Sequence, residues 1–294
     1  MIQRLQQSLA DEGQVTADVS ALCALFKVSR SGYYAHRRKT QGQRQQQDQH
    51  LAQQIEEVFY ASRATYGSPR LVAALREQGV HCGKNRIRRL MRERGLKARQ
   101  KRRRRPRTTH SDPALPVAAN LLGAVAAPTA INQQWVSDIT YIETQEGWLY
   151  LAGTLDCYSR RLVGWQVSTS LESEVVLSAA RRAFAGQQPA SGLIYHSDRG
   201  CQYASRNCQE LLQQHGAQQS MSRKGNCYDN AMMESFWATL KTECFGDYRA
   251  ATRAEAKSML FDCIEVFYNR QRRHSALGYL SPLQFELQSR HTAQ

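Results

Sequence analysis

Apolar residues recur at helical spacing along the first 95 residues, where they define two groups of short helices. Residues 17–38 are predicted to form two helices around a turn, with Ser29 as the N-cap of the second helix. This layout is typical of a helix-turn-helix module. The glutamine-rich residues 41–54 fit either a linker or an exposed helix. The pattern therefore predicts an all-α N-terminal region.

A second helical group spans residues 49–95 and ends on a helix with two contrasting faces. Ile87, Leu90 and Met91 share one face of this last helix, and arginines occupy its other faces. An apolar stripe backed by arginines favours a helix laid on DNA phosphates, and a solvated basic face is the alternative. The expected DNA contacts are Arg86, Arg88 and Arg89, with Arg102 and Arg103 of the basic run that follows.

From about residue 134 the pattern changes to strand-like alternation. Three predicted strands, 134–144, 148–156 and 162–168, form an antiparallel meander. The remaining predicted elements are a helix at 172–187, a strand at 193–197, a helix at 205–215, a strand at 218–222 and a helix at 229–244. This order of elements is that of a ribonuclease-H-like α/β domain.

These changes of pattern divide the chain into five parts. They are a helix-turn-helix-like module (1–45), a second basic helical module (46–110), a linker (111–130), a ribonuclease-H-like core (131–245) and a C-terminal helical extension (246–294). The linker is assigned from its alanine and proline content. The predicted fold class is α/β, with the core preceded by all-α modules that have the character of DNA-binding units.

Charge is distributed unevenly along the chain. The net charge is +15, but residues 1–110 hold 24 Lys and Arg against 8 Asp and Glu, a net of +16. The remaining residues hold 16 basic against 17 acidic side chains, a net of −1. A basic excess confined to one region indicates a polyanionic partner such as double-stranded DNA, rather than a soluble basic domain.

The chain has no feature that indicates export or a membrane. No stretch approaches the ~20 consecutive apolar residues of a membrane span, and the polar residues 1–10 do not resemble a signal peptide. The eight cysteines form no C-x-x-C pair, which favours reduced thiols over a zinc site or disulfides. A cytoplasmic protein is therefore expected.

Three carboxylates stand out by their positions. One lies where burial of an ionised group would cost free energy, and the others lie at the ends of elements, where functional residues are often found. Asp138 lies within a predicted strand, Asp198 directly follows another, and Glu234 lies in the first turns of a helix. If they converge, their mutual repulsion requires a cation, and oxygen-only ligands favour Mg²⁺ or Mn²⁺. Two such ions about 4 Å apart can drive an in-line phosphoryl displacement.

The sequence motifs around these residues resemble those of a known family. Thirty-five residues lie between Asp198 and Glu234, the spacing of DDE transposases and retroviral integrases. The segments WVSDITYI, TLDCYSRRLVGW, HSDRGCQY, SRKGNCYDNAMMESFWATLK and YNRQRRHSALGYLSP resemble, in order, the core of bacterial insertion-sequence transposases of the IS-three type. VSRSGYY, YGSPRLVAALREQGV and KNRIRRLMRERGLKAR resemble their N-terminal region. The match is to the second-frame (OrfB) product and covers nearly the whole chain.

The resemblance implies an enzyme that nicks transposon ends and joins them to target DNA. It places the catalytic triad, with two metal ions, on Asp138, Asp198 and Glu234. It gives Lys241 a DNA contact, with a surface lysine as the alternative. From their places in the sequence, Asn226 and Asn230 flank the catalytic loop and are candidates for positioning DNA or the groups around the metal, and His196, next to Asp198, is either a supporting residue or an ordinary strand-end residue. A homo-oligomer is expected, because two transposon ends must be brought together. The sequence has no leucine-zipper heptad, an element that the resemblance assigns to the first-frame (OrfA) protein, so OrfA is a possible partner. The missing retroviral-type zinc unit makes the resemblance one to the bacterial branch.

Other charged residues and other functions compete with this interpretation. Asp156 is interpreted as a turn former, Asp229 as a helix cap and Glu243 as a residue facing away from the site. The segment 272–274 (Arg-Arg-His) fits either a DNA or partner contact or a solvated helix end. The alternative functions are a non-catalytic helix-turn-helix regulator and a ribonuclease-H-like nuclease. The three carboxylates argue against the regulator, and the transposase motifs argue against the nuclease.

Overall fold

The computed structural model describes residues 18–37, 43–99, 117–123, 125–223 and 230–292. By its internal contacts the chain divides into a small unit, residues 1–56, and a large unit, residues 57–294. In the small unit, helices α2 (Val19–Leu25) and α3 (Arg30–Arg37) form the expected pair. Ser29 Oγ accepts a hydrogen bond from the Gly32 amide at 3.0 Å, which confirms Ser29 as the N-cap.

Three further helices follow the predicted pattern. They are α4 (Gln43–Ala61), α5 (Ser68–Glu77) and α6 (Lys84–Glu93). Residues 43–54 of the glutamine-rich segment belong to α4, so of the two interpretations offered for the segment the helix is the one observed there. Pro69 lies in the first turn of α5, where the missing amide hydrogen has no cost. The apolar stripe of α6 is buried, as its spacing predicts.

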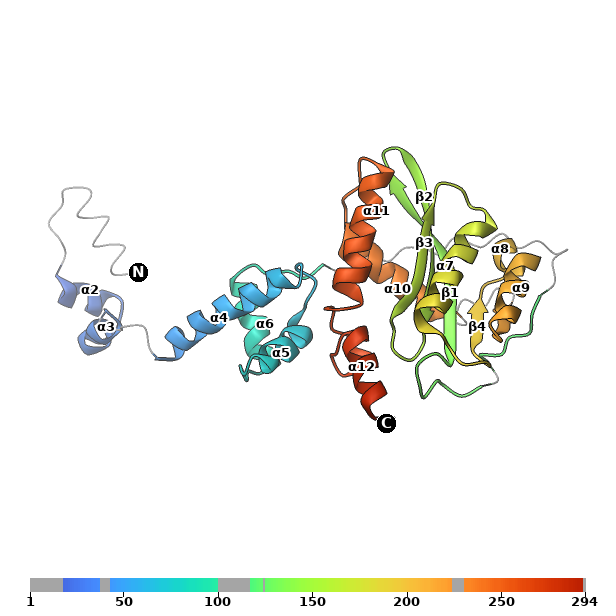
Figure 1. The fold of residues 1–294 in the computed structure, drawn as a ribbon. Helices are drawn as coiled ribbons and strands as arrows, with labels where there is room; N and C mark the ends of the chain where they lie inside the picture. Colours follow the sequence, from blue (N-terminus) through green and yellow to red (C-terminus); the bar gives the residue numbers. More distant parts are fainter. Residues whose placement is uncertain (1–17, 38–42, 100–116, 124, 224–229, 293–294) are drawn as a thin grey trace. The chain divides into compact units, whose positions relative to one another are not determined.

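A five-stranded sheet forms the centre of the large unit, in the order β3-β2-β1-β4-β5 (Figure 1). The strands are β1 (Gln134–Thr144), β2 (Gly147–Asp156), β3 (Leu162–Ser168), β4 (Ile194–Ser197) and β5 (Gln218–Met221). The first three strands pair antiparallel, and β4 and β5 run parallel to β1. The predicted meander and the ribonuclease-H-like α/β order of elements are confirmed.

Helices cover both faces of this sheet. One hydrophobic cluster joins the sheet to α7 (Ser173–Gln187), α8 (Cys201–Ala204) and α9 (Arg206–Gln214). The other joins it to α10 (Ala231–Leu240), the π-helical turn η2 (Lys241–Phe245), α11 (Arg253–Phe261) and a second π-helical turn η3 (Asp262–Tyr268). Alternate residues of a strand point to opposite faces, and accordingly Trp135 belongs to the first cluster and Val136 to the second.

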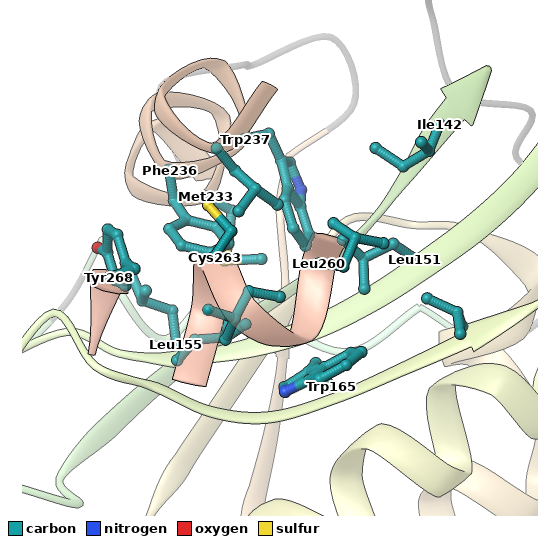
Figure 2. Packing of buried hydrophobic residues seen from close by; sticks show 14 of the residues in the cluster. Ile142, Leu151, Leu155, Trp165, Met233, Phe236, Trp237, Leu260, Cys263 and Tyr268 are labelled. Carbon is teal, nitrogen blue, oxygen red and sulfur yellow. The ribbon is translucent and has the colours of Figure 1, made fainter. Parts of the chain in front are cut away.

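The C-terminal helices complete the second of these clusters. Ile142 and Leu151 of the sheet, Met233 of α10 and Leu260 of α11 are all buried in this cluster, and Figure 2 shows Leu151 beside Leu260. The chain then ends with the short 3₁₀ helix η4 (Ser275–Leu277) and α12 (Pro282–Thr292). The predicted division at residues 245 and 246 stays a prediction, and helices on both sides of it share one core.

Glu243 lies at the centre of a buried ionic network. Arg272 donates to both oxygens of this carboxylate, at 2.5 and 2.6 Å, and the two side chains are only 3% and 9% exposed. Arg70 Nη1 lies 3.6 Å from Glu243 Oε1, and Arg99 Nη1 donates to the Glu243 carbonyl oxygen at 2.9 Å. The structure corrects both interpretations offered for Arg272, because its guanidinium is buried against Glu243 and is not on the surface, where a DNA or partner contact or a solvated helix end requires it.

Glu243→Gln is expected to destabilise the large unit by about 3 kcal/mol, because it leaves the buried Arg272 charge without its counter-ion. The measurement is the midpoint of urea unfolding, followed by tryptophan fluorescence. Glu93→Gln is the control, since Glu93 pairs with Arg89 on the surface of α6 and such pairs contribute less than about 1 kcal/mol. Equal midpoints for the two variants would show that the buried pair carries no special stability.

Candidate active site

The position of Asp138 follows from the alternation of β1. Val136, Asp138 and Ile142 point to the same face of the sheet, and Val136 and Ile142 belong to the cluster that packs against α10. The Asp138 side chain is half-buried on that face. Its carboxylate accepts a hydrogen bond from Trp237 Nε1 at 3.1 Å, so α10 lies directly over it.

The register of β1 with β4 brings a second carboxylate to the same level. Val136 pairs with His196, and this parallel register, continued by two residues, puts Asp138 opposite Asp198 at the end of β4. Neighbouring strands lie about 4.8 Å apart, and residues at one level of a parallel pair point to the same face. Asp198 Oδ1 accepts the Gly200 amide hydrogen at 3.0 Å, which holds the turn into α8.

The pKa of Asp138 is affected by both of the other carboxylates. Burial and then the negative charge of Asp198 raise the pKa of Asp138 to about 7, and the charge of Glu234 adds a smaller increase. Hydrogen bonds from the Ile139 amide and from Trp237 oppose this rise in pKa. An ionised Asp138 is therefore unfavourable here without a cation.

Glu234 is the outermost of the three. It is the fourth residue of α10, and its side chain is exposed. Within the part of the chain that the structure describes, no group of three or more His, Cys, Asp or Glu side chains is close enough to hold a metal ion. The structure thus brings Asp138 and Asp198 together, and it places Glu234 within electrostatic reach but not in a closed ligand shell.

His196, which the sequence suggested as a supporting residue, is fully buried. Its Nδ1 lies 2.8 Å from Ser220 Oγ, and its Nε2 lies 3.0 Å from Ser222 Oγ. The Ser222 amide also donates to the Ser197 carbonyl oxygen at 2.9 Å. The imidazole therefore ties the end of β5 to β4 beside Asp198, and both of its ring nitrogens are engaged in doing so.

The remaining predicted residues have different environments. Asn230 is buried at the N-cap position of α10, and its Nδ2 donates to the Ser137 carbonyl oxygen at 3.4 Å. Lys241 is half-buried at the start of η2. On α6, Arg88 is exposed, Arg86 is half-buried, and Arg89 is half-buried and pairs with Glu93 at 2.9 Å. Four residues lie outside the described ones: Asn226, Asp229, Arg102 and Arg103.

Asp156 is a structural residue, as predicted. Its carboxylate is fully buried and accepts amide hydrogens from Asn132, Tyr158 and Ser159 at 2.7 to 3.0 Å. The last two bonds close the turn between β2 and β3, which is the usual use of an aspartate at such a position. The Asp156 carboxylate therefore accepts hydrogen bonds from the backbone, and the structure gives it no part in the site.

Trp237 is the site residue that the sequence did not reveal. It lies three residues after Glu234 on α10, and its ring packs over Gly153 of β2. A β-carbon at Gly153 would lie 2.8 Å from Trp237 Cη2, closer than such atoms approach in proteins. The available signal was a glycine inside a strand, which often marks the close approach of another group.

Comparison with known proteins identifies the family. The integrase core domain family matches residues 128–227, a second integrase core domain pattern matches residues 215–282, and an HTH-like domain matches residues 46–104. The chain is 48% identical to the insertion element IS600 31 kDa protein of Shigella sonnei, over 90% of this chain and 97% of that protein. It is 38% identical to transposase InsF for insertion sequence IS3A of Escherichia coli, over 94% and 96%. The chain belongs to the IS3 family of insertion-sequence transposases.

A third relative agrees with this assignment. The transposase of insertion sequence element IS904 from Lactococcus lactis is 42% identical, over 80% of this chain and 93% of that protein. The protein is therefore a DDE transposase, an enzyme with an integrase-type core, and not a non-catalytic regulator. In the described part of this transposase, no helix has the length and apolar character needed to cross a bilayer.

Solved structures similar to this transposase come from retroviral integrases. An intasome of simian T-cell lymphotropic virus matches with a TM-score of 0.46 and 16% identity, over 73% of this chain and 69% of that one. The HTLV-2 integrase catalytic core domain in complex with magnesium matches with a TM-score of 0.43 and 15% identity, over 54% and 98%. The family assignment rests on the sequence relatives and not on these distant likenesses.

Proposed function

We propose that this transposase cleaves DNA strands at the ends of an insertion sequence and joins the freed 3′-hydroxyl to target DNA, with Asp138, Asp198 and Glu234 as catalytic ligands. The observation that carries the proposal is the parallel register of β1 with β4, which ends at Val136 and His196 and, continued by two residues, sets Asp138 beside Asp198. The raised pKa of Asp138 supports it, because a bound cation would relieve the repulsion that raises it.

We infer that the cofactor is a pair of divalent cations, Mg²⁺ or Mn²⁺. The fit rests on the donor set, since carboxylate oxygens are the ligands that these ions prefer. Such a pair, when bound, supplies activation of the attacking oxygen and stabilisation of the leaving 3′-oxygen. Asp138 and Asp198 would hold the cations from the sheet. Glu234 is exposed, so its side chain is free to turn toward the two aspartates and complete the ligand set.

The proposed DNA contacts lie on α6, in the basic run that follows it, and at the end of α10. On α6, the buried stripe fixes the helix and leaves Arg88 exposed toward a phosphate backbone. Lys241 lies seven residues after Glu234, two helical turns on, so it follows the same side of α10. Asn230 and His196 would act indirectly, by holding the elements that carry the carboxylates. The predicted contacts from Arg86, Arg89, Arg102 and Arg103, and the supporting role of Asn226, remain part of this proposal.

The reaction itself implies partners. Two transposon ends must be brought together, so we infer that the enzyme acts as a homo-oligomer on double-stranded DNA in the cytoplasm. The basic residues before position 110 provide most of the non-specific affinity for DNA, because the rest of the chain is nearly neutral. The first-frame OrfA protein is the proposed additional partner for recognition of the ends.

A nicking and strand-transfer assay on the terminal inverted repeats of the element tests this proposal. Asp198→Asn and Glu234→Gln are each expected to lower the Mg²⁺-dependent rate at least a hundredfold, because each removes an anionic ligand of the cations. DNA binding, measured by gel shift, should be unchanged. The control is Glu210→Gln, since Glu210 forms only a surface pair with Arg206 on α9. Full activity in either test variant would remove that residue from the catalytic set.

A further inference from the structure

We propose that Trp237 is a positioning residue, which holds the Asp138 carboxylate in the orientation that binds the cation, and that Gly153 leaves the space its indole needs. The inference rests on the proposed role of Asp138 and deepens it. It concerns a buried tryptophan of the hydrophobic cluster under α10 and the glycine of β2 on which its ring packs.

The first observation is a hydrogen bond from the core to the site. Trp237 is 5% exposed and extends from α10 toward the strands of the sheet (Figure 2). Its indole Nε1 donates to Asp138 Oδ2 at 3.1 Å. An indole has a single donor and no acceptor, so the bond to Asp138 uses the whole hydrogen-bonding capacity of the ring. A buried ring that donates to this oxygen restricts rotation of the carboxylate.

The second observation is the fit between the ring and β2. Gly153 is the direct cross-strand partner of Asp138. A β-carbon at position 153 would meet Trp237 Cη2 at 2.8 Å, Trp237 Cζ2 at 3.3 Å and Leu162 Cδ1 at 3.1 Å. Any side chain at this position would push the indole away from the strand. The missing side chain at Gly153 therefore allows the ring to lie beside Asp138.

A second tether acts on the same helix face. Asn230 and Trp237 are seven residues apart, so they lie two turns apart along one side of α10. Asn230 Nδ2 donates to the Ser137 carbonyl oxygen, and Trp237 Nε1 donates to the next residue, Asp138. The helix that carries Glu234 is thus fastened to β1 at the position of the catalytic aspartate. The spacing between the two elements is set by these contacts.

The expected consequence concerns metal affinity more than folding. Groups that hydrogen-bond to metal ligands orient them, and their loss usually weakens metal binding by about 10- to 100-fold. Without the indole N–H, the Asp138 carboxylate would sample more orientations and bind cations less tightly. A residue that only filled the core would affect stability and leave metal affinity as it was.

Trp237→Phe in the full chain tests the inference, with Mn²⁺ alone as the probe. Binding is measured by the electron paramagnetic resonance signal of free Mn²⁺, and we expect the affinity to fall about tenfold. Strand transfer should fall at low Mn²⁺ and recover in part as Mn²⁺ is raised. The matched control is Trp165→Phe, because Trp165 Nε1 also donates to a carboxylate, Glu265 Oε1 at 2.7 Å, from within the same cluster. That variant should bind Mn²⁺ like the wild type.

A second replacement keeps the test decisive if the smaller ring disturbs folding. Benzothienylalanine at position 237 retains the bicyclic shape and has sulfur in place of the N–H, so it removes only the donor. Wild-type Mn²⁺ affinity in this protein would overturn the inference. Asp138→Asn distinguishes the failure of the proposed function, since unchanged Mn²⁺ binding in that variant would remove Asp138 itself from the metal site.

Discussion

Asp138→Asn is expected to slow strand transfer about a thousandfold and, in the absence of divalent metal, to stabilise the fold. Cations in such a site stabilise the transition state by several kcal/mol, so loss of an anionic ligand should slow the reaction about a thousandfold. The same carboxylate is half-buried opposite Asp198, and both effects raise its pKa to about 7. Removing its charge therefore relieves a repulsion that the hydrogen bonds to this carboxylate offset only in part and that a bound cation would compensate in the wild type.

The sign of the pH dependence follows from this pKa. The folded state holds a proton on Asp138 more tightly than the unfolded chain does, where the pKa is near 3.8. The stabilisation from this group is fully present below about pH 4 and is lost as the pH rises through about 7. A shift of this size corresponds to about 4 kcal/mol, and partial contact with solvent should reduce the measured loss to about 2 kcal/mol.

Thermal unfolding in EDTA at pH 5.5 and pH 8.5 measures this effect. The wild type should lose more stability between the two values than Asp138→Asn, and added Mg²⁺ should stabilise only the wild type. Glu210→Gln serves as the control for loss of an acidic charge at a surface position. If Asp138→Asn showed the wild-type dependence on pH, Asp138 would not be the group that titrates in this range.

Most of the secondary structure could be predicted because it is encoded locally. The alternation from Gln134 to Thr144 predicts the strand that the structure shows as β1, with the same bounds. The apolar stripe of residues 87, 90 and 91 likewise predicts the buried face of α6. Each of these patterns repeats within one element, so no knowledge of the partner element is needed.

Contacts between distant residues were beyond such patterns. Arg272 and Glu243 lie 29 residues apart, and their types alone fit a solvated helix end as well as a buried pair. Trp237 and Asp138 lie 99 residues apart. Helical spacing places Trp237 in the core, but it does not say which group its indole donor meets. Such pairings depend on how the elements pack, which a single sequence does not specify.

The candidate site could be predicted only in part. Asp138 and Asp198 become neighbours only because β1 and β4 pair in parallel, and periodicity does not give the order of strands. It was the 35-residue interval and the surrounding motifs, through their resemblance to a family, that singled out the three carboxylates. A family motif has a limit, which the exposed Glu234 illustrates. The motif predicts the role of this residue but not where its side chain lies relative to the two aspartates.

Gly164→Ala is expected to destabilise the core by 3 kcal/mol or more, roughly the upper end for overpacking. A β-carbon at Gly164 of β3 would lie 2.3 Å from the Ala179 carbonyl oxygen and 2.7 Å from both the amide nitrogen and Cβ of Ala183. Two of these are backbone atoms of α7, so no side-chain rotation relieves the clash and the helix must move. Ala179 and Ala183 are themselves fully buried, which leaves no room for the helix to shift along the sheet.

The same substitution near the end of α7 gives a control of opposite sign. Gly186 lies inside the helix, and a β-carbon there would meet nothing within 4 Å. Gly186→Ala should therefore stabilise the protein by about 0.5 to 1 kcal/mol through its helix propensity. Urea unfolding midpoints compare the two variants. If Gly164→Ala unfolded at the wild-type urea midpoint, the close contact between β3 and the Ala179 and Ala183 backbone of α7 would be wrong. Because α7 covers the face of the sheet opposite to Asp138, folded Gly164→Ala protein should still bind Mn²⁺ with wild-type affinity.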